Sequence, residues 1–236
     1  MITKSTFRKL LLITLITLIT LGSQFGWAAT FYTCINTNLN LNVGTAPTGI
    51  SYLWDLKKDG IQVAGYPSAT APSNFTSAGS YELILHAQTD ATAGLCQSDP
   101  VVNTIIVLPE LGINLSAPTL PAYCVNSSVA SSDIIATTTG FLATYNTDLT
   151  TEYSYSVVKD SDAPVDGSTL GTIDATGKYT LTTTIPGVYK ITGTVKYKQI
   201  GSNTLLGSGC PISSTEQTIT VTPQPTAPTI IITAAP

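Results

Sequence analysis

The chain has 236 residues, of which only 10% are charged, and 14 acidic against 10 basic side chains give a net charge of −4. An acidic chain without a basic cluster repels phosphate backbones, which argues against nucleic acid as a partner. Thr, Ser, Ala, Gly and Pro are abundant and the charged helix formers are scarce, so the composition favours short strands and turns.

The first predicted element is a secretory signal peptide over residues 1–28. Three basic residues near its start precede the uncharged stretch 10–21, and Gly26 and Ala28 place small side chains before a cleavage site. A stretch of about 12 apolar residues is shorter than the roughly 20 that span a bilayer, so we expect no transmembrane segment. Removing its three basic residues leaves seven against fourteen acidic ones, a net charge of −7. We expect a secreted protein, extracellular or at the cell surface.

Residues 29–236 contain two copies of one unit. Residues 78–83 and residues 186–191 share a turn in which a small residue and a glycine precede a Tyr-x-aliphatic strand start. Internal similarity of this kind marks a repeat. The predicted boundaries are a first domain over residues 29–109, a second domain over 110–223, and a proline-rich linker with a terminal strand over 224–236.

The strands of the first domain alternate in polarity. One face of the strand 49–56 and one face of the strand 80–88 are apolar, which is typical of half-buried strands. A turn at residues 58–60 follows the first strand, with a glycine free to adopt positive φ. His86, the only histidine, falls on the outward face. The predicted inward residues are Ile50, Tyr52, Trp54 and Leu56 on the first strand and Tyr81, Leu83, Leu85 and Ala87 on the second.

The second domain shows the same alternation, with strand patterns at residues 153–157, 171–180 and 188–198. The last predicted strand of each domain, 104–108 in the first and 218–222 in the second, ends before a proline. Many short strands separated by turns, without a helical period, predict an all-β sandwich in each domain and almost no helix.

Four cysteines in an exported chain indicate two disulfides, for which three pairings are possible. Cys96 and Cys210 each stand 13 residues before a proline that ends a strand. Each unit also has an early cysteine, Cys34 or Cys124. The most economical pairing is therefore one bridge inside each unit, Cys34 with Cys96 and Cys124 with Cys210.

Several short motifs carry a family resemblance. They are residues 52–54, 59–60, 78–81 and 94–96 in the first unit and 171–180, 186–189 and 209–210 in the second. With these motifs, the chain resembles the immunoglobulin-like and PKD-like repeats of large bacterial surface proteins, especially Bacteroidetes adhesins and gliding-associated proteins. The resemblance implies two tandem immunoglobulin-like (PKD-like) β-sandwiches. The Tyr-x-Cys corner of antibody domains is absent from both units.

The sequence offers no clear set of catalytic residues. His86 has no second histidine to form a ligand pair, and the cysteines form no CxxC motif. Asp160, Asp162 and Asp166 could offer oxygen ligands to calcium. Their segment lacks the glutamate and the length of an EF-hand loop, and its Asp-Gly and Ala-Pro pairs also suit a solvated turn. We therefore expect no enzyme and no cofactor.

The last residues of the sequence resemble the lead-in to a further repeat unit. A proline-rich spacer leads into Thr229–Thr233, a β-branched run that predicts a strand. This run either begins a third repeat of a longer array or pairs with the edge of a neighbouring molecule.

These patterns favour a secreted, non-enzymatic structural or adhesive module whose partner is an extracellular protein or a glycan. The alternative is a carbohydrate-binding module associated with an extracellular hydrolase. An exposed, coplanar aromatic patch would favour the alternative, whereas burial of Trp54 and Tyr52 favours the first interpretation.

Overall fold

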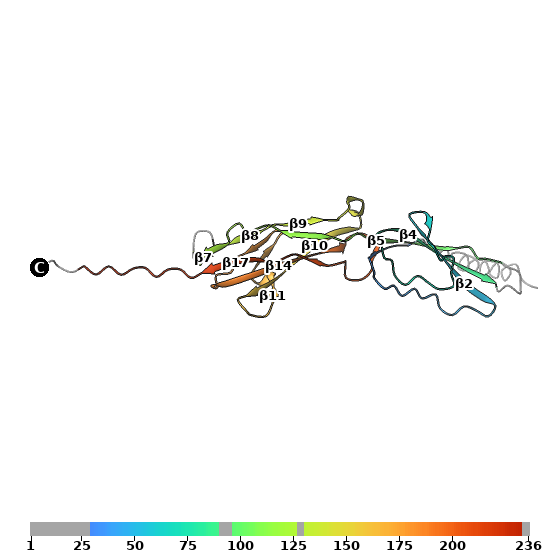
Figure 1. Cartoon of the computed structure of the whole chain (residues 1–236), viewed down its shortest axis with the longest axis horizontal. Coiled ribbons are helices and arrows are strands. Elements are labelled where there is room, and N and C mark those ends of the chain that lie inside the picture. The colour runs from blue at the N-terminus through green and yellow to red at the C-terminus, as the bar shows by residue number, and fades with distance from the viewer. Residues whose placement is uncertain (1–28, 90–95, 127–129, 233–236) are drawn as a thin grey trace, which may run out of the picture. The chain divides into compact units, whose positions relative to one another are not determined.

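A computed structural model describes residues 29–89, 96–126 and 130–232. The predicted signal peptide lies outside these ranges. The described residues form strands β1 to β17 and two 3-10 helices of three residues each, which confirms the all-β prediction (Figure 1). Across the same ranges, every helix is too short or too polar for a membrane span.

The described chain divides into two compact units whose segments alternate along the sequence. Of the described residues, unit 1 contains 29–30, 42–71 and 81–104 apart from the undescribed 90–95, and unit 2 contains 31–41, 72–80 and those from 105 onward. The early segment 31–41 therefore belongs to the same unit as the end of the chain. The domain boundary at residues 109 and 110 stays a prediction.

Unit 1 is built on one antiparallel sheet. Its centre is β2 (Ile50–Lys58) paired with β4 (Gly79–Thr89), so that Ile50 lies opposite Thr89 and Lys58 opposite Tyr81. The sheet order continues with β3 (Ile61–Gln62) beyond β2 and β5 (Val101–Leu108) beyond β4. The predicted hairpin turn joins β2 to β3, with positive φ at Asp59 and Gly60.

The predicted alternation in unit 1 is visible in the burial of its side chains. Trp54 and Leu56 on β2 and Tyr81 and Leu83 on β4 are buried, as the sequence pattern predicted. The other four predicted inward residues, Ile50, Tyr52, Leu85 and Ala87, are only half-buried. The described strands of unit 1 belong to this one sheet, and the burial of the inward residues of β2 is lower at its Ile50 end than at Trp54 and Leu56.

Unit 2 is a two-layer sandwich. Its larger sheet has the order β11-β10-β14-β17-β7, in which β7 runs parallel to β17. Its other layer contains β12-β13-β8 and the pair β6-β9. Because β8 and β9 follow each other, this layer has the A-B-E-D order and the first layer the C-F-G order of an immunoglobulin domain. The bounds are β6 Gly112–Leu115, β7 Ala122–Cys124, β8 Ser132–Ile134, β9 Ala136–Thr139, η2 Ala143–Tyr145, β10 Leu149–Lys159, β11 Val165–Asp166, η3 Gly167–Thr169, β12 Gly171–Ile173, β13 Tyr179–Leu181, β14 Gly187–Gln199, β16 Ile212–Ser213, which pairs with β14, and β17 Gln217–Thr222.

Buried tyrosines fill the core of unit 2. The hydroxyls of five of them donate to backbone carbonyls, whereas that of Tyr32 donates to Asp148. Tyr155 and Tyr179 stack with ring centroids 4.8 Å apart. The Tyr179 hydroxyl donates to the Gly167 carbonyl at 3.0 Å, and the Tyr155 hydroxyl donates to that of Gly177. A buried phenol needs such a partner, so these bonds fix the positions of the turns they reach.

Unit 2 also contains a tyrosine corner, which was not predicted from the sequence. The hydroxyl of Tyr189, near the start of β14, donates to the carbonyl of Ile185 four residues upstream at 2.7 Å. This is the contact made at the start of strand F in immunoglobulin domains. No cysteine follows Tyr189 two residues later, so the Tyr-x-Cys pattern was the wrong signal to look for.

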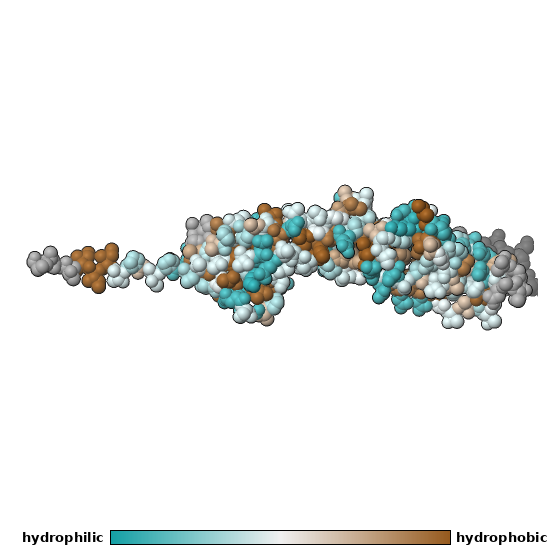
Figure 2. All heavy atoms as spheres, viewed as in Figure 1, coloured by the Kyte–Doolittle hydropathy of each residue, from teal (hydrophilic) through white to brown (hydrophobic). Residues whose placement is uncertain are grey.

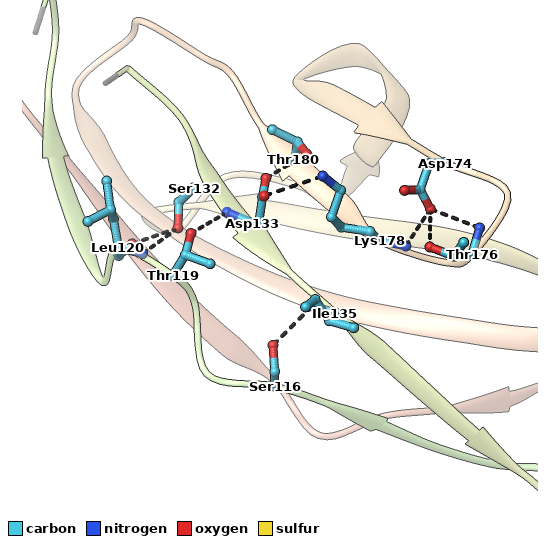
Figure 3. A network of polar contacts seen from close by, with 10 residues as sticks. All are labelled: Ser116, Thr119, Leu120, Ser132, Asp133, Ile135, Asp174, Thr176, Lys178 and Thr180. Carbon is cyan, nitrogen blue, oxygen red and sulfur yellow. Dashed lines mark hydrogen bonds and ion pairs between the residues drawn. The ribbon is translucent and has the colours of Figure 1, made fainter. Parts of the chain in front are cut away.

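Side-chain hydrogen bonds complete the second layer of unit 2 (Figure 3). The Ser132 hydroxyl accepts from the Leu120 N–H at 3.1 Å and donates to the Leu120 carbonyl at 2.7 Å. The Ile135 N–H donates to the Ser116 hydroxyl at 3.0 Å. Serine hydroxyls therefore join β8 and Ile135 to residues 116–120, the segment between β6 and β7, which is not paired as a strand.

Candidate functional site

One disulfide joins the early segment of the chain to its late part. Cys34, at the end of β1 (Thr30–Cys34), is bonded to Cys210, 176 residues later, with 5.5 Å between their Cα atoms. The predicted pairing of Cys34 with Cys96 and of Cys124 with Cys210 is therefore wrong. Cys96 and Cys124 are exposed free thiols. The prediction failed because it assumed that each repeat closes on itself.

The segment that carries Cys210 is a loop folded back along the end of β14. The Tyr197 N–H donates to the Gly209 carbonyl at 2.7 Å. Gly209 has φ +82, and a Cβ there would lie 2.2 Å from the Tyr197 carbonyl oxygen, so glycine is required. Cys210 itself has a positive φ of 55. This turn directs the Cys210 sulfur toward β1.

A short parallel strand pair lies next to the disulfide. In this pair, β1 runs beside β15 (Thr204–Leu205), with Phe31 opposite Thr204. The N–H of Leu206 extends the pairing by donating to the Tyr32 carbonyl at 2.8 Å. The disulfide and the strand pair together form what we call the clasp, residues 31–34 and 203–210.

A polar triad completes the clasp. The Tyr32 hydroxyl and the Asn203 side-chain amide both donate to Asp148 Oδ2, each at 2.9 Å. Hydrogen bonds from Asn203 and then Tyr32 hold the pKa of Asp148 below its ordinary value. Burial, and then the hydrogen bond to Asp148, raise the pKa of Tyr32 to about 12. The triad is therefore stable with Asp148 charged and Tyr32 neutral.

A hollow of about 230 Å³ lies against the disulfide. Apolar side chains and the two bridged cysteines form most of its wall, and Glu110 is the ionisable residue in its lining. Among the described residues, no group of three His, Cys, Asp or Glu side chains lies close enough together to hold a metal. The lining is Cys34, Ile35, Leu108, Pro109, Glu110, Leu111, Cys210, Pro211 and Ile212.

Of the predicted calcium ligands, Asp160 and Asp162 lie in the turn between β10 and β11, and Asp166 is the last residue of β11. Asp160 accepts from the Val188 N–H at 2.9 Å and lies 3.2 Å from the Lys159 ammonium group. Asp166 caps η3 by accepting from the Ser168 N–H at 2.8 Å. Backbone and side-chain hydrogen bonds lower the pKa of both carboxyl groups. Asp162 is exposed, and its N–H donates to the Lys159 carbonyl.

The aromatic residues considered for sugar binding are mostly inside the protein. Trp54 is 6% exposed and Tyr155 is 3% exposed, whereas Tyr52 and Tyr153 are half-buried. The Tyr153 hydroxyl lies 3.0 Å from the Thr138 hydroxyl. Within the described ranges, the large apolar side chains that are well exposed are all aliphatic.

His86 does not lie in an open, solvated position. Its side chain is half-buried opposite Leu53, and its Nδ1 atom is buried without a hydrogen-bond partner. No second histidine exists in the sequence with which it could form a ligand pair.

The segment after β17 is extended and forms no strand as far as Ile232. Ile230, Ile231 and Ile232 are 82%, 82% and 92% exposed and form the brown group near the C-terminal end in Figure 2. The last residue of the predicted terminal strand, Thr233, lies outside the described residues. Three adjacent exposed isoleucines are unusual at a protein surface.

Comparison with known proteins finds similarity in fold only. No protein family matches the sequence, and no curated protein matches it. The three N-terminal domains of the bacteriophage RB49 Highly Immunogenic Outer Capsid protein align over 81% of this chain and 67% of theirs, with 9% identity and a TM-score of 0.48. Fibronectin(III)-like modules of Clostridium thermocellum CbhA align over 84% of this chain and 93% of theirs, at 14% identity and a TM-score of 0.35. The Bacteroides ovatus mixed-linkage glucan utilization locus protein SGBP-B, solved with a mixed-linkage heptasaccharide, aligns over 85% of this chain and 67% of its own, at 17% identity and a TM-score of 0.26.

Proposed function

We propose that the chain is an exported, non-enzymatic structural module of the cell surface that resists extension. The observation that carries this proposal is the disulfide between Cys34 and Cys210. Residues 1–28 serve as the signal peptide in this proposal, which fits a protein that keeps a disulfide in an oxidising compartment.

The position of the disulfide determines how the chain transmits tension. A pull applied at the two ends passes from β1 through the sulfur atoms into the segment that follows Cys210. The residues between the two cysteines lie outside this covalent path. Without the bridge, 176 residues could be drawn out, a gain of about 600 Å at roughly 3.4 Å per extended residue.

Single-molecule force spectroscopy on the chain from residue 29 onward, pulled from both ends, tests this proposal. The oxidised protein should show no length gain near 600 Å, a value set by about 3.4 Å per residue. The double variant Cys34→Ser, Cys210→Ser should recover that gain. The matched control is Cys96→Ser with Cys124→Ser, which removes only free thiols and should behave like the oxidised parent. A full-length gain in the oxidised parent would refute the proposal.

The carbohydrate-binding alternative lacks structural support. Trp54 and Tyr155 are buried, so neither ring is available to stack on a sugar, and Tyr52 and Tyr153 are half-buried. The partner in our proposal is therefore an extracellular protein rather than a glycan. We further propose that it is engaged by strand pairing through residues 229–233. A specific glycan bound by the oxidised protein on a glycan array would favour the alternative.

A further inference from the structure

One long strand of unit 2 has an open edge. On one side, β14 pairs with all eleven residues of β10, from Leu149 to Lys159. On the other side, β11 pairs only with Ser156 and Val157. Residues along an antiparallel strand direct their N–H and C=O groups alternately to the two sides. In the described part of the chain, the outward groups of residues 149–155 therefore have no strand opposite them.

A hollow of about 430 Å³ runs beside this open edge. Half-buried Ile173 and Tyr153 form part of its wall on one side of the strand, and Ile200, which is 57% exposed, lies in the wall at the end of β14. Apolar side chains therefore line the hollow beside the position that a further strand would take. Such a strand would place alternate side chains on the two faces of the sheet.

The charges near the edge do not oppose an uncharged strand. Glu152 lies 3.0 Å from the Lys196 ammonium group and 2.6 Å from that of Lys198. Asp174 Oδ1 accepts hydrogen bonds from Thr176 and Lys178 of its own turn (Figure 3). The carboxylates in the wall of the hollow are therefore already compensated by groups of the same unit.

The chain contains a segment with the properties of the missing strand. Residues 229–232, Thr-Ile-Ile-Ile, are uncharged, β-branched and free of proline, so each can donate a backbone hydrogen bond. They are extended, and the three isoleucines are almost fully exposed. Pro223, Pro225 and Pro228 precede them and stiffen the spacer, which favours reaching another molecule over folding back.

We propose that residues 229–232 of one copy add as a strand to the open edge of β10, at residues 149–155, in a second copy. Main-chain hydrogen bonds would supply the affinity, and the isoleucines would pack against Ile173 and Ile200. This inference deepens the proposed function, because it names the partner of a surface module as another molecule of the same chain.

The test begins by removing a simpler source of dimers. Exposed Cys96 and Cys124 could link two molecules through a disulfide, so every protein carries Cys96→Ser and Cys124→Ser. Sedimentation velocity over a concentration series then measures association of the chain from residue 29 onward. Hydrogen exchange at high and low concentration locates the contact, with added protection expected at residues 149–155 and 229–232.

Two variants and one matched control locate the contact by mutation. Ile230→Asp with Ile232→Asp alters the donor strand, and Ile200→Asp alters the acceptor. Each should raise the concentration needed for half-association by about tenfold or more, because a carboxylate resists burial beside apolar side chains. Ile185→Asp is the control, since Ile185 is equally exposed at 57% and lies outside the hollow.

Three outcomes would overturn the inference. These are a monomer at every concentration, equal weakening by Ile200→Asp and Ile185→Asp, or protection of an edge other than residues 149–155. An unlinked synthetic peptide of residues 223–236 should also dissociate the assembly, and the absence of any effect at a large excess would be a fourth such outcome. The force experiment uses single molecules, so its result and the association result can fail independently.

Discussion

Units 1 and 2 use similar strands but differ in how completely they bury them. The completely buried large side chains of the described residues, which include Tyr179, Tyr189 and Leu181, all lie in unit 2. The most buried residues of unit 1, such as Leu83 and Leu56, keep a few per cent of exposure. Alternation of polar and apolar residues is therefore enough to form a strand, but side chains are completely buried only where a second sheet packs against the first.

The largest expected effect comes from truncating the centre of the unit 2 core. Tyr179→Ala removes a fully buried ring that stacks on Tyr155, and we expect it to lower the free energy of unfolding by about 3–5 kcal/mol. Guanidinium chloride denaturation, followed by near-ultraviolet circular dichroism, measures this loss. Ile185→Ala, at an exposed position, should change it by less than about 0.5 kcal/mol.

The same experiment in unit 1 sharpens the comparison. Trp54→Ala should reduce the hydrogen-exchange protection of β2 and β4 while leaving β14 unchanged, because Trp54 belongs to the separate core of unit 1. Equal loss of protection in β14 would show that the two units unfold together and would contradict the assignment of Trp54 to a separate core.

An intermediate loss of stability is expected from a substitution in the second layer of unit 2, the layer that contains β8. Ser132→Ala leaves both the N–H and the carbonyl of Leu120 without the hydroxyl they now bond (Figure 3). The expected cost is about 1–3 kcal/mol, since Ser132 is buried and both groups lose a partner. Thermal unfolding measures it, and Thr176→Ala in the exposed turn of Asp174 serves as a milder control. Equal costs for the two variants would mean that the Ser132 bonds have no special role.

The smallest effect is the pH dependence that the bonded pair Asp148 and Tyr32 gives to unit 2. Asp148 has a lowered pKa when folded, so its contribution is present above its ordinary value of 3.8 and is lost as pH falls through the folded pKa. Tyr32 has a raised pKa of about 12, so its contribution is present below pH 10 and is lost as pH rises from 10 toward 12. Other buried tyrosines of unit 2, such as Tyr123 and Tyr197, have pKa values raised to about 12 and add to this alkaline loss.

Hydrogen exchange of the Leu206 amide, which bonds to Tyr32, reports on the acid side of this dependence. In Asp148→Asn the protection of that amide should no longer decrease below pH 4. Unchanged acid sensitivity in that variant would assign the effect to a different carboxyl group.

Much of the fold could be predicted from local sequence patterns. The alternation at Trp54 and Leu56, the turn at Asp59 and Gly60, and the entry into β14 at Gly187 all appear where the residues indicated. These features depend on neighbours in sequence, and period-two burial and positive φ are local properties.

The clasp could not be predicted because it depends on a loop that differs between the repeats. The equal spacing of Cys96 and Cys210 from a proline suggested equal partners, yet only Cys210 is bonded. The useful signal was the glycine-rich run at residues 207–209, which turns the chain back at the end of β14. Tyr32, Asp148 and Asn203 carried no motif, since their relation exists only after residues far apart in sequence meet.

The bond between Cys34 and Cys210 also sets a condition on how the protein matures. Synthesis runs from the N-terminus to the C-terminus, so Cys34 emerges before Cys96 and Cys124, and Cys210 emerges after them. Oxidation in order of emergence would join Cys34 to Cys96, and the correct bond would then require thiol–disulfide exchange. Cys96 and Cys124, which are free thiols in the folded protein, are the two cysteines synthesised between Cys34 and Cys210. Correct maturation therefore depends on Cys34 remaining reduced, or being reopened, until translation has passed residue 210.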